Sequence, residues 1–334
     1  MTSLPLPRRW RSAVSIVATL IAVGLVASAC GSDRTTPGST TVITRTAQAP
    51  SGSSSAAPSS AAPSSTAPAK PAAKPVHVSL KFGDGQVLGV GIPIIAFLSR
   101  PISDARAFAA ATKVTVNGRR VNGGWFFERK YGDSGHPIEA DYRLQTYWPA
   151  HSQIHLSLPV KGLSAGSGLV FDNSLTLDFA TGVSRIVTVD DATHKLTVVA
   201  DGKVWGTFPV SLGAPNTRTR RGVKVIMEKG NSICMSGPGY HECGVRYTQR
   251  LTYDGEYLHA APWNTANIAR GVDSSNGCTN LTMGDAKQLY DFLDVGDVVR
   301  YPNANGRLMQ IGDGYGDWNV PWSQWQLGGL YRTS

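Results

Sequence analysis

From residue 75 onward, the chain contains short runs in which apolar and polar residues alternate, separated by turn-forming residues. The clearest run is 153–158, where Ile154, Leu156 and Leu158 alternate with polar side chains. A period of two places every second side chain on one face of a β-strand. The 36 Gly and 20 Pro residues and the charged fraction of 16% favour turns over long helices. The sequence therefore predicts a mainly β protein.

The first 30 residues have the pattern of an export signal. Arginines within residues 8–11 precede an apolar run, 13–27, that is too short for a comfortable membrane span. Small residues and then Cys30 follow, and they resemble the lipobox of bacterial lipoproteins, in which the cysteine is lipidated. An ordinary secretory signal cleaved near Ala29 is the alternative. With lipidation, we expect an exported protein anchored to the outer face of the cytoplasmic membrane, in the cell-wall space.

The residues after this signal are Ser, Thr, Ala and Pro with almost no large apolar side chain. Such a segment cannot bury enough surface to offset the entropy of ordering, so we expect a semi-extended tether. Next comes a β-sandwich pattern of immunoglobulin-like size, in which the sequence shows no convergence of titratable groups. The predicted segments are a signal at 1–30, a tether at 31–75, an immunoglobulin-like domain at 76–183, a β-rich domain with one or two helices at 184–302, and a Trp-rich extension at 303–334.

The formal charge of +9 comes from scattered Lys and Arg residues. This distribution indicates a solvated basic surface and does not predict nucleic-acid binding. Aromatic side chains concentrate instead in the last 30 residues, which include Trp318, Trp322 and Trp325. Aromatic residues bury large areas, so we expect the extension to pack on the 184–302 domain, with sugar stacking as the alternative.

The four cysteines divide into three roles in an exported protein. Cys30 is assigned to lipid. Cys234 and Cys243 lie in a Gly- and Ser-rich segment that we expect to form a flap, and an oxidising compartment favours a disulfide over two reduced thiols. A zinc site is not expected, because only His241 lies near this pair and no second cysteine pair exists. Cys278 remains as an odd thiol, which indicates a reactive one.

A histidine that could activate this thiol lies on the same stretch of chain, at position 259. A thiol attacks readily at neutral pH when a nearby base removes its proton, and histidine is the usual base. Gly277 allows the backbone to approach a substrate closely. The alternative is a buried structural cysteine and an unrelated surface histidine.

Three motifs, in this order along the chain, resemble the L,D-transpeptidases of bacterial cell-wall synthesis. The loop 213–222 is similar to the family's Gly-x-x-x-Thr-Pro-Thr-x-x-Gly, with Arg218 in place of Pro. The family's His followed by Ser-His-Gly-Cys-x-Asn reads here as His259 and then 275–280. The closing segment 314–322 resembles the tail of lipoprotein-type members that also carry immunoglobulin-like domains.

This resemblance implies a role for each matching residue. Cys278 is the nucleophile, and His259 is its base, oriented by the main-chain carbonyl of Ala260. The N–H groups of Gly277 and Cys278 would form an oxyanion hole, and Tyr240 of the flap would help to polarise the substrate carbonyl. The remaining matched positions that line the site are Trp263, Ser275, Asn276 and Asn280.

The implied reaction is acyl transfer without a metal or organic cofactor. Cys278 attacks a tetrapeptide stem of peptidoglycan and releases D-Ala, and an amine of a second stem then forms a 3→3 cross-link. Carbapenem β-lactams are expected covalent inhibitors. The alternatives are an L,D-carboxypeptidase that uses the same site and a catalytically weak wall-binding lipoprotein. Asn276 replaces the family's His and cannot titrate near neutral pH, so we expect altered acylation rates.

Overall fold

The computed structural model describes residues 72–130, 135–237, 239–315 and 317–334. Cys30, the predicted signal and most of the predicted tether lie outside these residues. Within the described ranges, no helix is both long enough and apolar enough to cross a membrane. The mainly β fold class is confirmed, because short strands make up most of the regular structure.

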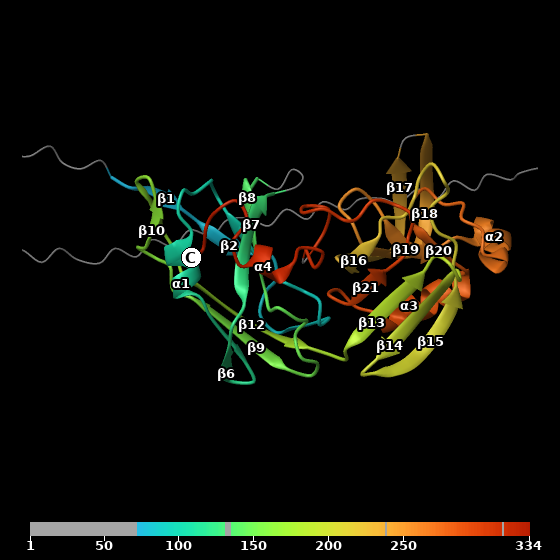
Figure 1. The fold of residues 1–334 in the computed structure, drawn as a ribbon, viewed down its shortest axis with the longest axis horizontal. Helices are drawn as coiled ribbons and strands as arrows, with labels where there is room; N and C mark the ends of the chain where they lie inside the picture. The colour runs from blue at the N-terminus through green and yellow to red at the C-terminus, as the bar shows by residue number, and fades with distance from the viewer. Residues whose placement is uncertain (1–71, 131–134, 238, 316) are drawn as a thin grey trace, which may run out of the picture. The chain divides into compact units, whose positions relative to one another are not determined.

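The first domain is a β-sandwich (Figure 1). One sheet runs in the order β3 (Gln86–Leu88), β12 (Leu175–Thr181), β9 (Gln153–Leu158), β5 (Lys113–Val116) and β6 (Arg119–Val121). The second runs in the order β2 (Val78–Leu80), β4 (Ile94–Leu98), β8 (Ile138–Arg143) and β7 (Gly124–Arg129). A small third sheet contains β1 (Lys74–Val76), β11 (Leu169–Phe171) and β10 (Ser164–Gly166).

Alternation along the strands builds the core of this domain. Ile154, Leu156 and Leu158 of β9 are buried, while the residues between them are more exposed. The helix α1 (Arg106–Ala111) adds Phe108, whose ring lies 5.1 Å from that of Trp125. Tight packing of such aromatic side chains supplies much of the apolar burial. The core therefore lies between the two larger sheets.

The charged strand of this domain does not stand out in the sequence. Residues 144–148 are irregular, and the strand is β8, at 138–143. It carries three charged residues, yet all six residues of β8 are buried because other parts of the chain cover both faces of its sheet. The N-cap of α1 is Ala105, and the side chain of the preceding Asp104 accepts a hydrogen bond from the Arg106 N–H at 2.9 Å.

The second domain also contains two sheets. One runs in the order β15 (Lys203–Pro209), β14 (Lys195–Ala200), β13 (Arg185–Asp190), β21 (Val298–Tyr301) and β16 (Gly222–Val225). The other runs in the order β17 (Glu228–Gly237), β18 (Tyr240–Arg250), β19 (Tyr257–Ala260) and β20 (Thr279–Leu281). Between β19 and β20 lie the 3-10 helix η1 (Pro262–Asn264) and the helix α2 (Thr265–Arg270).

The helix α3 (Met283–Phe292) follows β20 directly and fixes the end of that strand. Its N-cap is Thr282, whose hydroxyl oxygen accepts a hydrogen bond from the Asp285 N–H at 3.2 Å. This cap satisfies one of the free amides at the start of the helix. Ala286 and Leu289 are the buried positions of α3, and they join the apolar core of the second domain.

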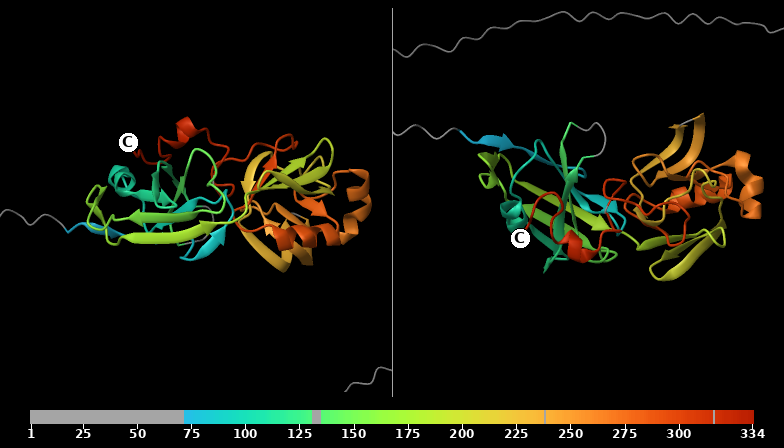
Figure 2. Two further views of the ribbon diagram at one scale, coloured as in Figure 1. Left: turned by 90° about the horizontal axis from the view of Figure 1, so that it is seen from below. Right: turned by 45° about the horizontal axis from the view of Figure 1, so that its top comes forward.

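The prediction that 303–334 packs on the second domain was only partly right. Asn319 does bond to β16, because its side-chain amide exchanges two hydrogen bonds with the backbone of Val223 at 2.8 and 2.9 Å. The helix α4 (Trp322–Trp325), however, lies on the first domain. The Trp325 ring stacks on Phe126 at 4.8 Å, and its Nε1 donates to the Gly124 carbonyl at 2.8 Å. Figure 2 shows the red C-terminal segment running along the first domain to the chain end marked C. The extension therefore contacts both domains, because the outer face of β7 offers an aromatic partner that sequence patterning did not reveal.

Candidate active site

Two short parallel strands bring the predicted nucleophile and base to one pocket. The register of β19 and β20 pairs His259 with Asn280, and Cys278 lies immediately before β20. Side chains two residues apart on a strand share a face, so Cys278 and Asn280 point to the same side. Both line a pocket of about 210 Å³ together with His259, Tyr240 and Trp263. Ser275 and Asn276 also line this pocket.

The His259 ring is buried, and a backbone bond fixes its orientation. Its Nδ1 lies 2.9 Å from the Ala260 carbonyl oxygen, the contact that the sequence resemblance implied. Because a carbonyl can only accept, Nδ1 carries the proton and Nε2 is left as the basic nitrogen. Burial lowers the pKa of His259, so the ring favours its neutral form. The exposed Trp263 ring lies against it, with ring centroids 6.1 Å apart.

The Cys278 thiol is also buried, and at rest it is protonated. Burial raises the pKa of Cys278 to about 12, with a further rise from Glu256, while the backbone N–H of Tyr257 and the charge of Lys224 oppose the shift. The thiol donates to the Gly255 carbonyl at 3.5 Å. Across the described residues, no hydrogen bond joins Cys278 to His259. The resting pair is therefore a neutral thiol and a neutral imidazole, each bonded to a backbone carbonyl.

The loop that carries Cys278 is held by hydroxyl groups. The Ser275 hydroxyl accepts from the Gly277 N–H at 3.1 Å and donates to the Cys278 carbonyl at 2.6 Å. The Thr219 hydroxyl donates to the Gly277 carbonyl at 2.9 Å. Gly277 has a φ of 111°, a conformation that favours glycine. The Gly277 N–H, expected as an oxyanion donor, is thus already engaged, because the Ser275 hydroxyl closes the turn.

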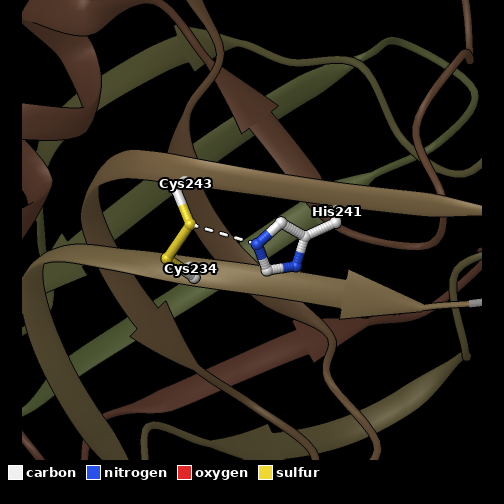
Figure 3. A group of neighbouring side chains, drawn as sticks. All are labelled: Cys234, His241 and Cys243. Atoms are coloured by element: carbon white, nitrogen blue, oxygen red, sulfur yellow. Dashed lines mark hydrogen bonds between the residues drawn. A yellow bond between two sulfur atoms is a disulfide. The ribbon is translucent and has the colours of Figure 1, made fainter.

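The predicted flap is a β-hairpin, β17–β18. A disulfide joins Cys234 on β17 to Cys243 on β18 (Figure 3). His241 extends from β18 beside this bond, with its Nε2 3.3 Å from the Cys243 sulfur and its Nδ1 2.6 Å from the Ser236 hydroxyl. These contacts link the two strands near Tyr240, which lines the Cys278 pocket. Burial and then the Cys278 charge raise the pKa of Tyr240, which is consistent with a hydroxyl beside the nucleophile.

A second pocket, of about 520 Å³, meets the first at Tyr240 and Asn276. Gly277 lines it as well. Arg218, which stands where the family motif has Pro, also lines it and donates to the carbonyls of Pro215 at 3.1 Å and Asn305 at 3.4 Å. The exposed Asn276 therefore lies between two cavities that meet beside the nucleophile.

Sequence reasoning missed a charged network behind Cys278. Lys224 of β16 is 0% exposed, and its ammonium pairs with a Glu256 carboxylate oxygen. The other oxygen of Glu256 accepts from the Arg220 backbone N–H at 2.9 Å, and the Arg220 side chain pairs with Asp254. The alternation in 222–225 indicates a strand, but it does not show that its lysine points inward. No local pattern could have identified this network.

A second missed group of residues supports the same pocket. Asn264 donates to the Ser211 hydroxyl at 3.2 Å and accepts from the Ser274 hydroxyl at 3.0 Å. The backbones of Ser211 and Asn280 exchange hydrogen bonds at 2.9 and 3.2 Å. The Asn280 side-chain oxygen is buried without a partner within the described part of the chain. An unpaired buried acceptor in a pocket is well placed to bind a substrate N–H.

A buried thiol, an oriented neutral imidazole and a covering hairpin define a cysteine acyl-transfer site. Residues 184–300 match the model of the L,D-transpeptidase catalytic domain, and residues 34–164 match that of the bacterial Ig domain. The chain therefore contains an L,D-transpeptidase catalytic domain, with a bacterial Ig domain ahead of it.

Individual relatives agree with these matches. L,D-transpeptidase 2 of Mycobacterium tuberculosis is 29% identical over 77% of this chain, and the chain spans 64% of that relative's length. A solved L,D-transpeptidase in complex with imipenem is 26% identical, with a TM-score of 0.54 over 67% of this chain and 97% of the other. L,D-transpeptidase 3 of Mycobacterium tuberculosis, solved with a faropenem-derived adduct, is 27% identical, with a TM-score of 0.53 over 67% of this chain and 97% of the other.

Proposed function

We propose that this protein is an L,D-transpeptidase that forms 3→3 peptidoglycan cross-links through a Cys278 acyl-enzyme, with a tetrapeptide stem as the acyl donor. The observation that carries the proposal is the single pocket shared by Cys278 and His259, in which the Ala260 carbonyl holds Nδ1 and leaves Nε2 as the base. The family match supports it from an independent direction.

In the first half-reaction, the substrate carbonyl binds between Cys278 and the flap. The thiol leaves its bond to the Gly255 carbonyl, and its proton passes to His259 Nε2 as the sulfur attacks the carbonyl carbon. The Cys278 N–H and the Tyr240 hydroxyl stabilise the oxyanion. The amide C–N bond then breaks, His259 returns the proton to the leaving nitrogen, and D-Ala departs.

In the second half-reaction, the side-chain amine of a second stem attacks the thioester carbonyl. His259 takes a proton from the attacking amine, the C–S bond breaks, and His259 returns the proton to the departing sulfur, which regenerates the thiol. The second pocket gives an acceptor stem a separate approach, past Tyr240 and Asn276. Asn280, with its unpaired side-chain oxygen, is assigned to hold a donor amide N–H.

Product analysis tests the proposal. The protein and the Cys278→Ala variant are incubated with a single disaccharide-tetrapeptide, and the products are resolved by mass spectrometry. We expect a cross-linked dimer and released D-Ala with the parent protein, and unchanged substrate with the variant. Tripeptide without dimer would identify an L,D-carboxypeptidase instead. Unchanged substrate with a folded parent protein would favour a wall-binding role.

Carbapenems are proposed as covalent inhibitors that acylate Cys278. A structurally similar L,D-transpeptidase was solved with imipenem, and another with a faropenem-derived adduct. A β-lactam carbonyl reacts with the thiolate as the stem amide does, and ring opening leaves the drug attached to the sulfur.

We also propose that Cys30 is lipidated and anchors the protein to the outer face of the cytoplasmic membrane. The support is the apolar run followed by small residues and a cysteine, together with the Ser-, Ala- and Pro-rich residues that separate Cys30 from the folded domains. Metabolic labelling with an alkyne-tagged fatty acid should mark the parent protein and not Cys30→Ala. Equal labelling of the two would contradict the assignment.

A further inference from the structure

A cluster of acidic side chains lies on the outer face of the sheet β2-β4-β8-β7, away from the active site. Glu128 is on β7, and Glu139 and Asp141 are on β8. The register pairs Glu128 with Glu139, and Asp141 is two residues further along on the same face. Asp317 comes from the C-terminal extension, whose helix α4 lies beside β7 (Figure 1). Sequence patterning showed no such convergence in this domain, because Asp317 lies far away along the chain.

Three of these carboxylates are buried, and each has at least one oxygen without a hydrogen-bond partner among the described residues. The exposed fractions are 1% for Asp141, 6% for Glu128 and 5% for Asp317. Both Asp141 oxygens, Glu128 Oε2 and Asp317 Oδ2 have no hydrogen-bond partner among the described residues. Buried carboxylates are normally paired, hydrogen-bonded or bound to a cation. One oxygen from each of the three lies within 4.8 Å of the others.

Neighbouring cations do not balance this cluster. Lys130 pairs with Glu139, its ammonium 2.5 Å from Oε2. The Arg143 guanidinium donates to the carbonyls of Leu144 at 3.2 Å and Val320 at 2.9 Å. Neither cation hydrogen-bonds to Asp141 in the described ranges.

We propose that Glu128, Asp141 and Asp317 bind one Ca²⁺ ion. Calcium takes oxygen ligands at about 2.3–2.6 Å, so two oxygens on opposite sides of the ion lie up to about 5 Å apart, as these groups do. Mg²⁺ usually keeps several waters and binds only one or two carboxylates, and Zn²⁺ prefers nitrogen and sulfur ligands. A three-carboxylate site therefore fits calcium best. The cluster holds four carboxylates, and the charges of Lys130 and Arg143 offset two of them. The two positive charges of a Ca²⁺ ion balance the other two.

The bound ion would join parts of the chain that are far apart in sequence. Glu128 and Asp141 belong to the immunoglobulin-like domain, and Asp317 belongs to the extension. Asn319, two residues after Asp317, bonds to Val223 of β16 in the catalytic domain. Calcium would thus hold the extension on the Ig-like domain at the point where it also contacts the catalytic domain. This role is independent of the proposed reaction.

The test compares the parent protein with Asp141→Asn after treatment with chelator and dialysis. Calorimetric titration with CaCl₂ should show one saturable site per parent chain. Calcium at a hundredfold excess over Kd should raise the thermal midpoint by about 5 °C. Asp141→Asn should lose both responses but remain folded, with a midpoint in chelator at least equal to the parent's. Asp178→Asn changes an exposed carboxylate on β12 and should respond as the parent does.

Each other outcome counts against the proposal. No binding and no midpoint shift in the parent would overturn it, and would indicate carboxyls that carry protons. An equal calcium response in Asp141→Asn would place the ion elsewhere. A response to MgCl₂ with none to CaCl₂ would overturn the choice of calcium. Should Asp141→Asn not fold, Glu128→Gln provides the same comparison.

Discussion

Two buried charged networks in this protein differ in how completely their members are paired. Behind Cys278, Lys224 pairs with Glu256, whose second oxygen accepts a backbone N–H. On the immunoglobulin-like sheet, both oxygens of the buried Asp141 lack a partner among the described residues. A buried carboxylate that is paired with a cation holds its neighbours in place, whereas an unpaired one indicates that a further ligand is needed. The first network is therefore interpreted as support for the nucleophile, and the second as a binding site.

The largest expected effect is on the rate of acylation, and it distinguishes His259 in the pocket from His241 on the flap. His259→Ala should lower the second-order rate constant for imipenem acylation by about 10²–10⁴-fold, because the thiol loses its proton acceptor. His241→Ala alters an exposed flap residue, and its rate constant should stay within about twofold of the parent's. Stopped-flow fluorescence measures both rate constants. Similar losses in the two variants would mean that His259 is not the base.

The next effect is on the free energy of unfolding, and it tests the Lys224–Glu256 pair behind Cys278. Lys224→Met should lower the free energy of unfolding by about 3–5 kcal/mol, because Glu256 is left as an uncompensated buried charge. The double variant Lys224→Met with Glu256→Leu should recover much of this loss. Urea unfolding of both variants measures the difference. A cost below about 1 kcal/mol for Lys224→Met would show that the network does not stabilise the site.

The pH dependence of acylation tests the protonation state of the resting pair. Burial lowers the pKa of His259, so the base stays neutral, and the rate stays high, until the pH falls below the usual histidine value of about 6.5. The rate should rise again at alkaline pH, as the medium approaches the Cys278 pKa of about 12. Imipenem acylation rates measured across the pH range provide the check. A tenfold loss already at pH 7 would contradict a neutral pair.

A smaller effect distinguishes the acidic cluster from the network behind Cys278. In chelator, Asp141→Asn should raise the free energy of unfolding by about 1 kcal/mol, because it removes an unpaired buried charge. This sign is opposite to that expected for Lys224→Met, and urea unfolding again measures it. If Asp141→Asn destabilises the chelated protein as strongly as Lys224→Met does, the two networks do not differ as described.

The smallest effect concerns Asn276, where the family motif has His. Asn276→His should change the acylation rate by about two- to fivefold if a titratable group there tunes the thiol, because the side chain lies between the two pockets. The variant and the parent are compared with imipenem under identical conditions. Equal rates would show that this position only donates a hydrogen bond.

The sequence predicted those features that depend on local pattern or on an ordered motif. Alternation identified β9, and the motif order identified Cys278 and His259 as candidates. Features that depend on contacts between distant segments were not predictable. The inward direction of Lys224 and the packing of Trp325 on Phe126 are of this kind. The charged strand β8 was missed for the same reason, because a segment far along the chain covers it.

Intact-protein mass spectrometry after exposure to imipenem tests the central claim, that Cys278 is the acylated nucleophile, most directly. We expect the parent protein to gain the mass of one imipenem molecule, and folded Cys278→Ala to gain none. No adduct on the parent protein, or the same adduct on Cys278→Ala, would contradict the claim.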